Sequence, residues 1–229
     1  MIASQAISFG RIGKSLAIAA ALFIGSVPLT AEHSAAQTTQ QAQPVALTNV
    51  QAIDAVSKYF NSVRNMHGKF VQFGPTGGRV EGQFFISRPG KVRFYYNKPS
   101  TLDIIADGSM VSVKDRKLQT QDIWPLSQTP LRFLLADKID LKTDANVTNV
   151  VVEPDLITIT IDDKTRFTSG RLTLIFDARD YKLKQWTVRD AQGYDTSVAI
   201  YDVVENGATN PDLFKIDYIA NSRQRRGNN

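Results

Sequence analysis

The chain offers few side chains for catalysis, because it contains no cysteine and only 2 histidines. A zinc site of histidine and cysteine ligands and a cysteine nucleophile therefore have almost no basis in the sequence. Chemistry would depend on carboxylates, hydroxyls or amines. A retaining glycosidase, for example, needs two carboxylates about 5 Å apart on facing strands. The acidic residues considered for such a pair are Asp103, Asp107, Asp162 and Asp163.

Structural roles explain these polar residues more simply. Asp107 begins an Asp-Gly turn, and the run from Asp162 to Lys164 also predicts a polar turn. His67 is expected where the first helix ends, where its charge would be favourable. The sequence shows no nucleophile elbow, phosphate-binding loop or metal-ligand spacing. We therefore expect neither an enzyme nor a metal site, and no cofactor.

The length and net charge of the chain are those of one globular domain with a mild positive charge. A chain of 229 residues with a net charge of +5 can form one β-barrel or sandwich without disulfides. Part of the charge lies in an arginine-rich tail, which could contact anionic lipid or nucleic acid, but a solvated terminus is the simpler interpretation. We predict a single domain over residues 47–219, a basic tail over residues 220–229, no nucleic-acid partner and a monomer.

The N-terminus has the pattern of an export signal. Two basic residues precede an apolar run over residues 15–29, which is too short for a bilayer span and contains a helix-breaking proline. Small residues follow, and we place cleavage after Ala36. Residues 37–46 form a flexible polar leader. The sequence thus predicts a cleaved signal peptide over residues 1–36 and export from the cytoplasm; the alternative is an uncleaved signal that anchors the chain.

Ordered structure is expected to begin with one amphipathic helix. Thr48 and Gln51 fit a capping box, in which both side chains satisfy free backbone amides. The helix is predicted to end near Gly68. Its apolar residues recur at intervals of three and four and are Val50, Ile53, Val56, Phe60 and Val63.

Downstream of this helix the apolar period changes to two, and turn signals separate the runs. Many short strands joined by tight turns form an antiparallel meander that tends to curl. The predicted fold class is therefore mainly β with a few helices (α+β), a strongly curved antiparallel sheet that forms an incomplete barrel. The candidate strands are residues 68–73, 79–87, 91–97, 102–106, 109–115, 117–121, 147–153, 156–162, 170–176, 183–189, 196–204 and 213–218.

The strand over residues 91–97 has one apolar face and one polar face. Alternate residues are apolar, and a period of two places them on the same side of a sheet. We expect this side, together with the matching side of the preceding strand, to line an apolar cavity. The predicted cavity residues are Phe84, Ile86, Val92, Phe94 and Tyr96.

A short, strongly apolar helix interrupts the strands. Thr129 is expected to be its N-cap, with Pro130 at the first helical position. A helix this apolar needs a concave apolar surface on which to lie. The pattern fits either a fixed core element or a movable lid, and by itself favours the core element. Its apolar residues are Leu131, Phe133, Leu134 and Leu135.

The order of short motifs along the chain carries a resemblance to a known family. These motifs are Phe70-Val71-Gln72, Arg88-Pro89, the aromatic strand that follows, Pro99, Asp107-Gly108 and the run from Thr129 to Leu135. With them in this order, the chain resembles the periplasmic outer-membrane lipoprotein carrier family, LolA. The likeness extends over nearly all of the predicted mature chain.

The resemblance implies a helical lid over an apolar cavity that takes the acyl chains of a lipoprotein. Arg88 matches the family arginine that holds the closed lid through hydrogen bonds; without the resemblance it would be interpreted as a solvated arginine. The strand that contains Phe94 matches the cavity-lining row. The implied lid residues are Val56, Phe60, Val63, Leu131, Phe133, Leu134 and Leu135.

The resemblance also implies partners and a compartment. The carrier would work in the periplasm of a Gram-negative bacterium, receive acylated lipoproteins from an inner-membrane lipoprotein-releasing ABC transporter, and deliver them to an outer-membrane acceptor or to the outer membrane directly. Two departures are visible: the family's proline-rich segment after the last strand is not evident, and the absence of cysteine argues against the lipoprotein acceptor branch. The alternatives are a lipid- or lipoprotein-sensing module of the same fold and a carrier of another lipid.

Overall fold

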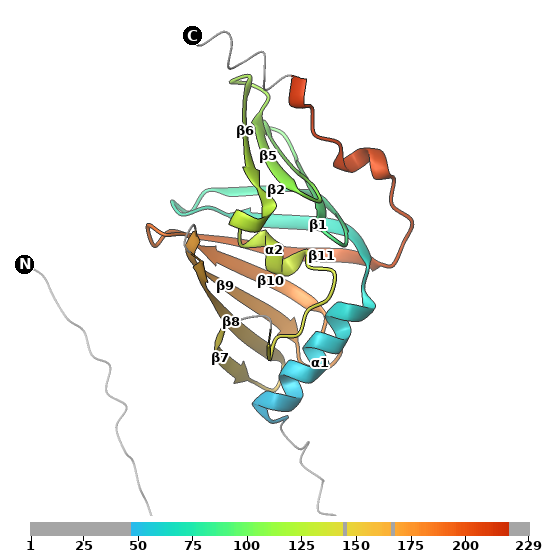
Figure 1. Cartoon of the computed structure of the whole chain (residues 1–229), viewed down its shortest axis with the longest axis vertical. Helices are drawn as coiled ribbons and strands as arrows, with labels where there is room; N and C mark the ends of the chain where they lie inside the picture. Colours follow the sequence, from blue (N-terminus) through green and yellow to red (C-terminus); the bar gives the residue numbers. More distant parts are fainter. Residues whose placement is uncertain (1–46, 144–145, 166–167, 220–229) are drawn as a thin grey trace, which may run out of the picture. The chain divides into compact units, whose positions relative to one another are not determined.

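The computed structural model describes residues 47–143, 146–165 and 168–219. Most of this part of the chain is β-sheet (Figure 1). The elements in chain order are α1 (Asn49–Ser62), β1 (Asn65–Phe73), β2 (Arg79–Ser87), β3 (Lys91–Tyr96), β4 (Leu102–Asp107), β5 (Met110–Asp115), β6 (Thr120–Pro125), η1 (Leu126–Gln128), α2 (Leu131–Leu134), β7 (Val147–Val152), β8 (Leu156–Thr165), β9 (Thr168–Asp177), β10 (Leu183–Arg189), β11 (Asp195–Glu205) and η2 (Pro211–Phe214).

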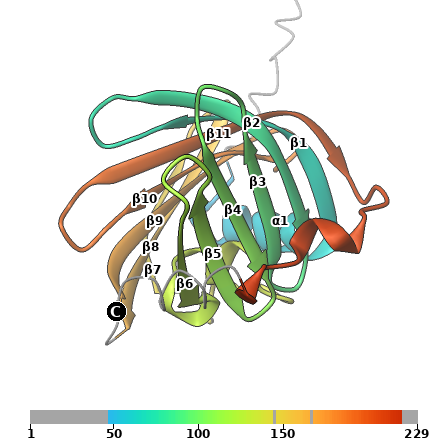
Figure 2. The same ribbon diagram turned by 90° about the horizontal axis from the view of Figure 1, so that it is seen from above.

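The strands form one 11-stranded antiparallel sheet in the order β6-β5-β4-β3-β2-β1-β11-β10-β9-β8-β7. Seen from above, the sheet curves strongly (Figure 2). Because β6 and β7 lie at opposite ends of this order, they are its two edges and the sheet stays open. The predicted fold class, a mainly β protein with a curved antiparallel incomplete barrel and few helices, is confirmed.

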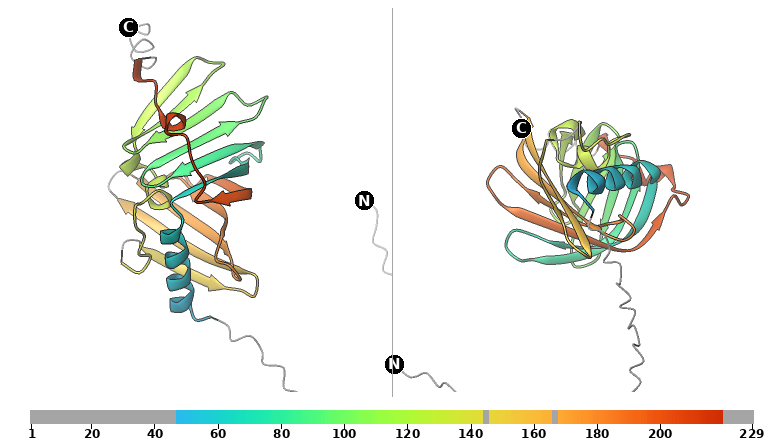
Figure 3. Two further views of the ribbon diagram at one scale, coloured as in Figure 1. Left: turned by 90° about the vertical axis from the view of Figure 1, so that its right-hand side faces the viewer. Right: turned by 90° about the horizontal axis from the view of Figure 1, so that it is seen from below.

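The concave side of the sheet contains the core. In β3, Val92, Phe94 and Tyr96 are at most 5% exposed, whereas the alternate residues are more exposed, as a period of two requires. α1 lies on this concave side (Figure 3). Its residues Val56 and Phe60 are buried in the common apolar core. Sheet and helix therefore bury their apolar faces in each other.

The N-terminus of α1 is as predicted, but its C-terminus is not. Thr48 and Gln51 form the capping box. The helix ends at Ser62, and the expected end near Gly68 is wrong, because β1 begins at Asn65 and pairs with both β2 and β11. His67 consequently lies in β1, where its ring stacks on Phe85 with centroids 6.1 Å apart, and not at the end of a helix.

The predicted strand over residues 213–218 is wrong. This segment begins inside the 3-10 helix η2 (Pro211–Phe214), which crosses the outer face of the sheet (Figure 2). It cannot add to β3 or β4, because each already has a strand on both sides. Phe214 is buried instead, Arg93 donates to the Leu213 carbonyl at 3.3 Å, and the Tyr218 hydroxyl donates to Asp107 Oδ2 at 2.6 Å.

Two local predictions between residues 115 and 165 are also wrong. The predicted strand 117–121 begins at Thr120, because Asp115 accepts hydrogen bonds from the amides of Lys117 and Leu118 and holds them in a turn. The predicted turn from Asp162 to Lys164 belongs to β8, which pairs there with β9.

The Thr129 N-cap is likewise wrong. Pro130 occupies the N-cap position of α2, no side chain caps the helix there, and the Thr129 hydroxyl instead donates to the Leu126 carbonyl at 2.9 Å. Among the described residues, no helix is both long and apolar enough to cross a membrane.

Candidate functional site

The inner face of the sheet brings the predicted cavity residues together. Phe84 pairs with Phe94 and Ile86 with Val92 across β2 and β3, so these side chains lie on one face. All five predicted residues, Tyr96 included, are at most 5% exposed. They form a continuous apolar surface.

An aromatic cluster extends this surface to β1 and β10. The centroid of the Phe70 ring lies 5.3 Å from that of Phe94 and 5.0 Å from that of Tyr96. The ring centroids of Phe94 and Trp186 are 6.0 Å apart. Gly82 makes room for this cluster, because a Cβ there would lie 2.8 Å from the Phe70 ring. Phe70 and Trp186 were not predicted as site residues, although the alternation of apolar residues in their strands could have indicated them.

The hydroxyl group of this cluster has a hydrogen-bond partner. The buried Tyr96 hydroxyl donates to Gln72 Oε1 at 2.6 Å, and burial raises the pKa of Tyr96 well above its usual value. Tyr96 therefore stays neutral at physiological pH, and its uncharged ring and hydroxyl are compatible with the buried apolar surface. Gln72 is a further residue that sequence reasoning missed.

The predicted lid residues lie opposite this face. Val56, Phe60 and Val63 are buried along α1, and the Phe60 ring packs edge-on against Phe176 with centroids 5.5 Å apart. The residues of the second apolar helix, α2, and its C-cap contact the same core. Of these, Leu134 and Leu135 are buried, and Leu131 and Phe133 are partly buried.

A pocket of about 270 Å³ lies between α1, the segment after α2, and strands β8 and β9. This is below the roughly 300 Å³ at which pockets begin to hold a drug-sized ligand. The residues that line it are Phe60, Arg132, Phe133, Ala136, Lys138, Ile139, Leu141, Ile161 and Leu174.

Arg88 lies between the sheet and α1. It is 7% exposed, and its Nη2 donates to the carbonyl oxygens of Phe60 and Val63 in the last turn of the helix. Its guanidinium also lies 5.3 Å from the centroid of the Phe60 ring. Burial and, to a smaller extent, the positive charge of the nearby Arg64 guanidinium lower the pKa of Arg88 to about 10. The group therefore remains charged at neutral pH.

The turn after Arg88 also contacts α2. The Gly90 amide donates to the Leu135 carbonyl at 2.8 Å. Gly90 has a φ of 77°, and a Cβ there would lie 2.7 Å from the Cα of Gly108, so only glycine fits. One turn between β2 and β3 thus hydrogen-bonds the C-terminal ends of both helices.

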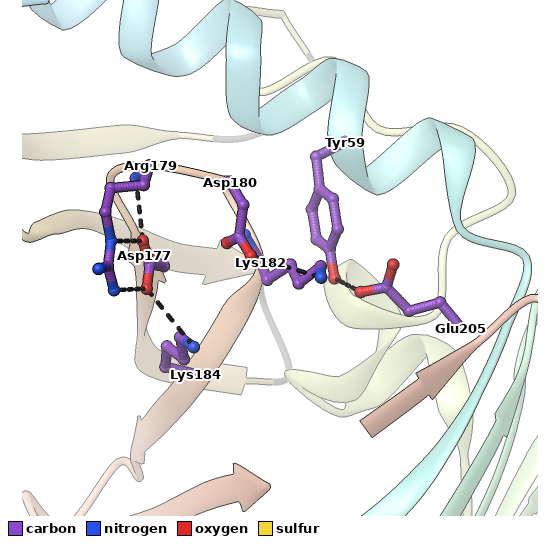
Figure 4. A network of polar contacts seen from close by, with 7 residues as sticks. All are labelled: Tyr59, Asp177, Arg179, Asp180, Lys182, Lys184 and Glu205. Carbon is purple, nitrogen blue, oxygen red and sulfur yellow. Dashed lines mark hydrogen bonds and ion pairs between the residues drawn. The ribbon is translucent and has the colours of Figure 1, made fainter. Parts of the chain in front are cut away.

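Tyr59 makes a second side-chain contact between α1 and the sheet. Figure 4 shows its ring pointing from α1 towards Glu205 at the end of β11. The hydroxyl donates to Glu205 Oε1 at 2.7 Å. Burial, and then the hydrogen bond to this carboxylate, raises the pKa of Tyr59 well above its usual value. Neither residue has a local sequence signal for this role, because 146 positions separate them.

A polar stripe of α1 binds the segment that follows α2. We define this stripe as Asp54, Ser57, Asn61 and Arg64, at helical spacings of three, four and three. Asn61 exchanges two hydrogen bonds of 2.9 Å with the Ile139 backbone, and Arg64 forms an ion pair of 2.7 Å with Asp137. Asp54 pairs with Lys142 at 2.5 Å, and Ser57 accepts from the Leu141 amide at 3.5 Å. The segment therefore runs antiparallel along the helix.

Three of the four carboxylates considered for catalysis, those of Asp103, Asp107 and Asp162, have structural partners, and the side chain of Asp163 lies outside the described residues. Arg93 binds Asp103 through two hydrogen bonds of 3.2 and 2.8 Å, and Arg171 binds Asp162 at 2.8 Å. Asp107 accepts from two amides of its own turn. Within the described ranges, no three histidine, aspartate or glutamate side chains are grouped so that they could hold a metal ion. Nothing in this arrangement assigns them a catalytic role.

Comparison with known proteins points to one family. The model of the family "Outer membrane lipoprotein carrier protein LolA" matches residues 61–217. The outer-membrane lipoprotein carrier protein of Chromohalobacter salexigens is 27% identical over 211 residues, which cover 89% of this chain and 91% of the relative. That of Methylobacillus flagellatus is 26% identical over 164 residues, with coverages of 68% and 80%.

A solved structure of a LolA superfamily protein from Nitrosomonas europaea is also similar, with 11% identity, coverages of 76% and 100%, and a TM-score of 0.40. The family model accounts for well over half of the sequence. The chain belongs to the outer-membrane lipoprotein carrier protein family, LolA.

Proposed function

We propose that the protein binds the acyl chains of lipoproteins released from the inner membrane and delivers them to the outer membrane. The observation that carries this proposal is the apolar inner face of the sheet, covered by helices through a small number of polar contacts. A lipid anchor costs about 0.8 kcal/mol per methylene exposed to water, so a carrier must enclose it. The inner face formed by β1, β2, β3 and β10, together with the helices that cover it, would provide such an enclosure.

The proposal requires the lid to open before cargo enters. The pocket of about 270 Å³ is too small for the acyl chains of a lipoprotein. Opening would break the contacts of Arg88 and Gly90 and the Tyr59–Glu205 hydrogen bond. The free energy of these contacts subtracts from the affinity for cargo, which makes release possible. Arg88 is the proposed clasp, because it donates charge-assisted hydrogen bonds to two lid carbonyls.

We infer further that α1 and the segment over residues 131–142 open as one body. The polar stripe binds residues 137–142 of this segment with ion pairs and hydrogen bonds, from Asp54 to Arg64. If the two moved apart, the Asn61 amide and the Ile139 backbone would both lose partners. Movement of both away from the sheet would keep these contacts between them.

The proposed setting is the periplasm of a Gram-negative bacterium. Residues 1–36 would act as the export signal, an ABC transporter of the inner membrane would supply the cargo, and an outer-membrane acceptor or the outer membrane itself would receive it. These partners and this compartment follow from membership of the family and from the pattern of the N-terminus.

The test is to identify the molecules that the protein carries. The full chain would be expressed in a Gram-negative host, purified from the periplasm without detergent and analysed by native mass spectrometry. We expect a triacylated lipoprotein bound to the parent protein. Phospholipid alone would contradict lipoprotein carriage and favour a carrier of another lipid.

Two glutamate substitutions on neighbouring residues provide a matched comparison. Phe94→Glu places a carboxylate on the inner face, where an unpaired charge repels acyl chains. Tyr95→Glu places the same group on the outer face, where the side chain is 46% exposed. We expect only Phe94→Glu to lose an acyl-chain fluorescent probe, and circular dichroism would verify that both variants fold. Equal probe binding by both variants would show that β3 does not line the cavity.

A further inference from the structure

Two adjacent turns at one end of the sheet form a single surface. We name this surface the basic rim and define it as Tyr95, Lys98, Pro99, Arg116, Lys117 and Leu118. The first turn connects β3 to β4 and the second connects β5 to β6. Thr101 Oγ1 donates to Asp115 Oδ1 at 2.8 Å, and the Arg116 amide donates to the Thr101 carbonyl at 3.0 Å. These bonds fix the two turns relative to each other.

The tip of the second turn holds an apolar side chain out into solvent. Asp115 Oδ1 accepts from the amides of Lys117 and Leu118 at 2.8 and 3.0 Å, and the Gln119 side chain donates to the Arg116 carbonyl at 2.7 Å. Leu118 is 68% exposed, more than any other large hydrophobic residue that the structure describes. The turn is therefore built so that a leucine protrudes.

The cations of the basic rim are free to bind an external anion. Lys98, Arg116 and Lys117 form no ion pair with a carboxylate of the described residues. The Arg116 guanidinium lies 5.3 Å from the centroid of the Tyr95 ring. The nearby carboxylate of Asp115 is occupied by the turn. Several cations elsewhere on the surface are paired with carboxylates, among them Arg64, Lys69, Arg79, Arg171 and Arg189.

A groove connects these groups. It has a volume of about 770 Å³, and Tyr95, Lys98, Pro99 and Arg116 are among the residues that line it. The groove thus combines an exposed aromatic face with two cations. Tyrosine, lysine and arginine are the residues that proteins place at the level of lipid headgroups, with apolar side chains beneath them.

We propose that the basic rim docks the protein on an anionic lipid bilayer. Headgroup phosphates would pair with Lys98, Arg116 and Lys117, and Leu118 would enter the boundary of the acyl chains. A membrane interface satisfies both the unpaired cations and the protruding leucine, whereas an acidic protein surface would satisfy only the cations. This inference does not depend on the proposed carrier function.

The basic rim lies far from the lid contacts along the sheet. β3 starts beside the turn that contains Arg88 and ends beside the turn that contains Lys98. Substitutions in the rim therefore leave the lid contacts intact. Membrane docking and cargo loading can be measured separately on the same variants.

The experiment is co-sedimentation of the full-length chain, as processed by the host, with vesicles. One set contains phosphatidylglycerol and phosphatidylcholine in equal parts, and the other contains phosphatidylcholine alone. Each lysine or arginine near an anionic surface contributes about fivefold to binding. We expect the affinity of the triple variant Lys98→Gln/Arg116→Gln/Lys117→Gln for the anionic vesicles to fall at least about tenfold. Leu118→Ser keeps every charge, and its affinity for the anionic vesicles should fall several-fold.

A control matched in charge removes three lysines elsewhere: Lys69→Gln/Lys182→Gln/Lys215→Gln. We expect it to bind anionic vesicles like the parent. Equal losses in both triple variants, parent-like binding by Leu118→Ser, or no preference of the parent for anionic vesicles would overturn the inference. Binding of the acyl-chain probe reports separately on the proposed function: if the parent sediments with vesicles but binds no probe, carriage fails while the docking surface stands.

Discussion

The hydrogen bond between Tyr59 and Glu205 gives a direct way to weaken the closed lid. Tyr59→Phe removes one hydroxyl and leaves the ring in place. The lost bond is 2.7 Å long and ends on a carboxylate. Such bonds contribute about 1.5–3 kcal/mol, and the lower figure applies here because both side chains are only partly buried. If the bond breaks on opening, the lid-open fraction rises about tenfold, and the apparent affinity for cargo rises by the same factor.

Tyr218→Phe is the matched control. Its hydroxyl also donates to a carboxylate, that of Asp107, but on the outer face of the sheet. Both variants would be titrated with a fluorescent acyl-chain probe, and their unfolding midpoints would be measured in parallel. We expect tighter probe binding for Tyr59→Phe and unchanged binding for Tyr218→Phe. If the two variants bind the probe equally, the Tyr59–Glu205 bond does not limit lid opening.

The other predictions concern the clasp, the lid and acid stability. Arg88→Leu should load cargo but return it poorly, because the closed state loses its charge-assisted hydrogen bonds; normal hand-over in a reconstituted transfer assay would contradict this. Since the chain has no native cysteine, the two cysteines of Asp54→Cys/Lys142→Cys can be joined with a short bismaleimide. If α1 and the segment after α2 open as one body, as proposed, the crosslinked protein should bind the acyl probe as well as the uncrosslinked one. Loss of binding on crosslinking would refute that motion. Arg179 binds both oxygens of Asp177, and these hydrogen bonds lower the pKa of Asp177 well below its usual value (Figure 4). A lowered folded-state pKa stabilises the protein above the unfolded value of about 3.9, and this contribution is lost as the pH falls. Asp177→Asn should therefore be less stable than the parent at neutral pH, and the difference in unfolding midpoint should shrink in acid; a difference independent of pH would refute the argument.

Local patterns in the sequence were sufficient wherever neighbouring residues determine the structure. The capping box of Thr48 and Gln51 predicts where α1 begins, because its donors and acceptors lie three residues apart. The alternation through Val92, Phe94 and Tyr96 predicts which face of β3 is buried. The same alternation in the other strands, with turn signals between them, predicts a curved antiparallel sheet.

Local patterns failed where a distant segment competes for the same residues. The pattern of α1 did not show that it ends at Ser62, because strands β2 and β11 recruit residues from Asn65 onward. The apolar alternation near Phe214 resembled a strand, yet that segment crosses the outer face, since neither β3 nor β4 has a free edge.

By itself, the sequence of this LolA family member determined the fold class, the start of α1 and the apolar face of β3, because these depend on contacts between residues close in the chain. Only the tertiary structure decided which side chains hold α1 to the sheet and to the segment after α2. Tyr59 meets Glu205 across 146 positions, and Asn61 meets Ile139 across 78. Each of these side chains is an ordinary polar residue of a helix or strand, and it gains a role only when folding brings its partner within hydrogen-bonding distance.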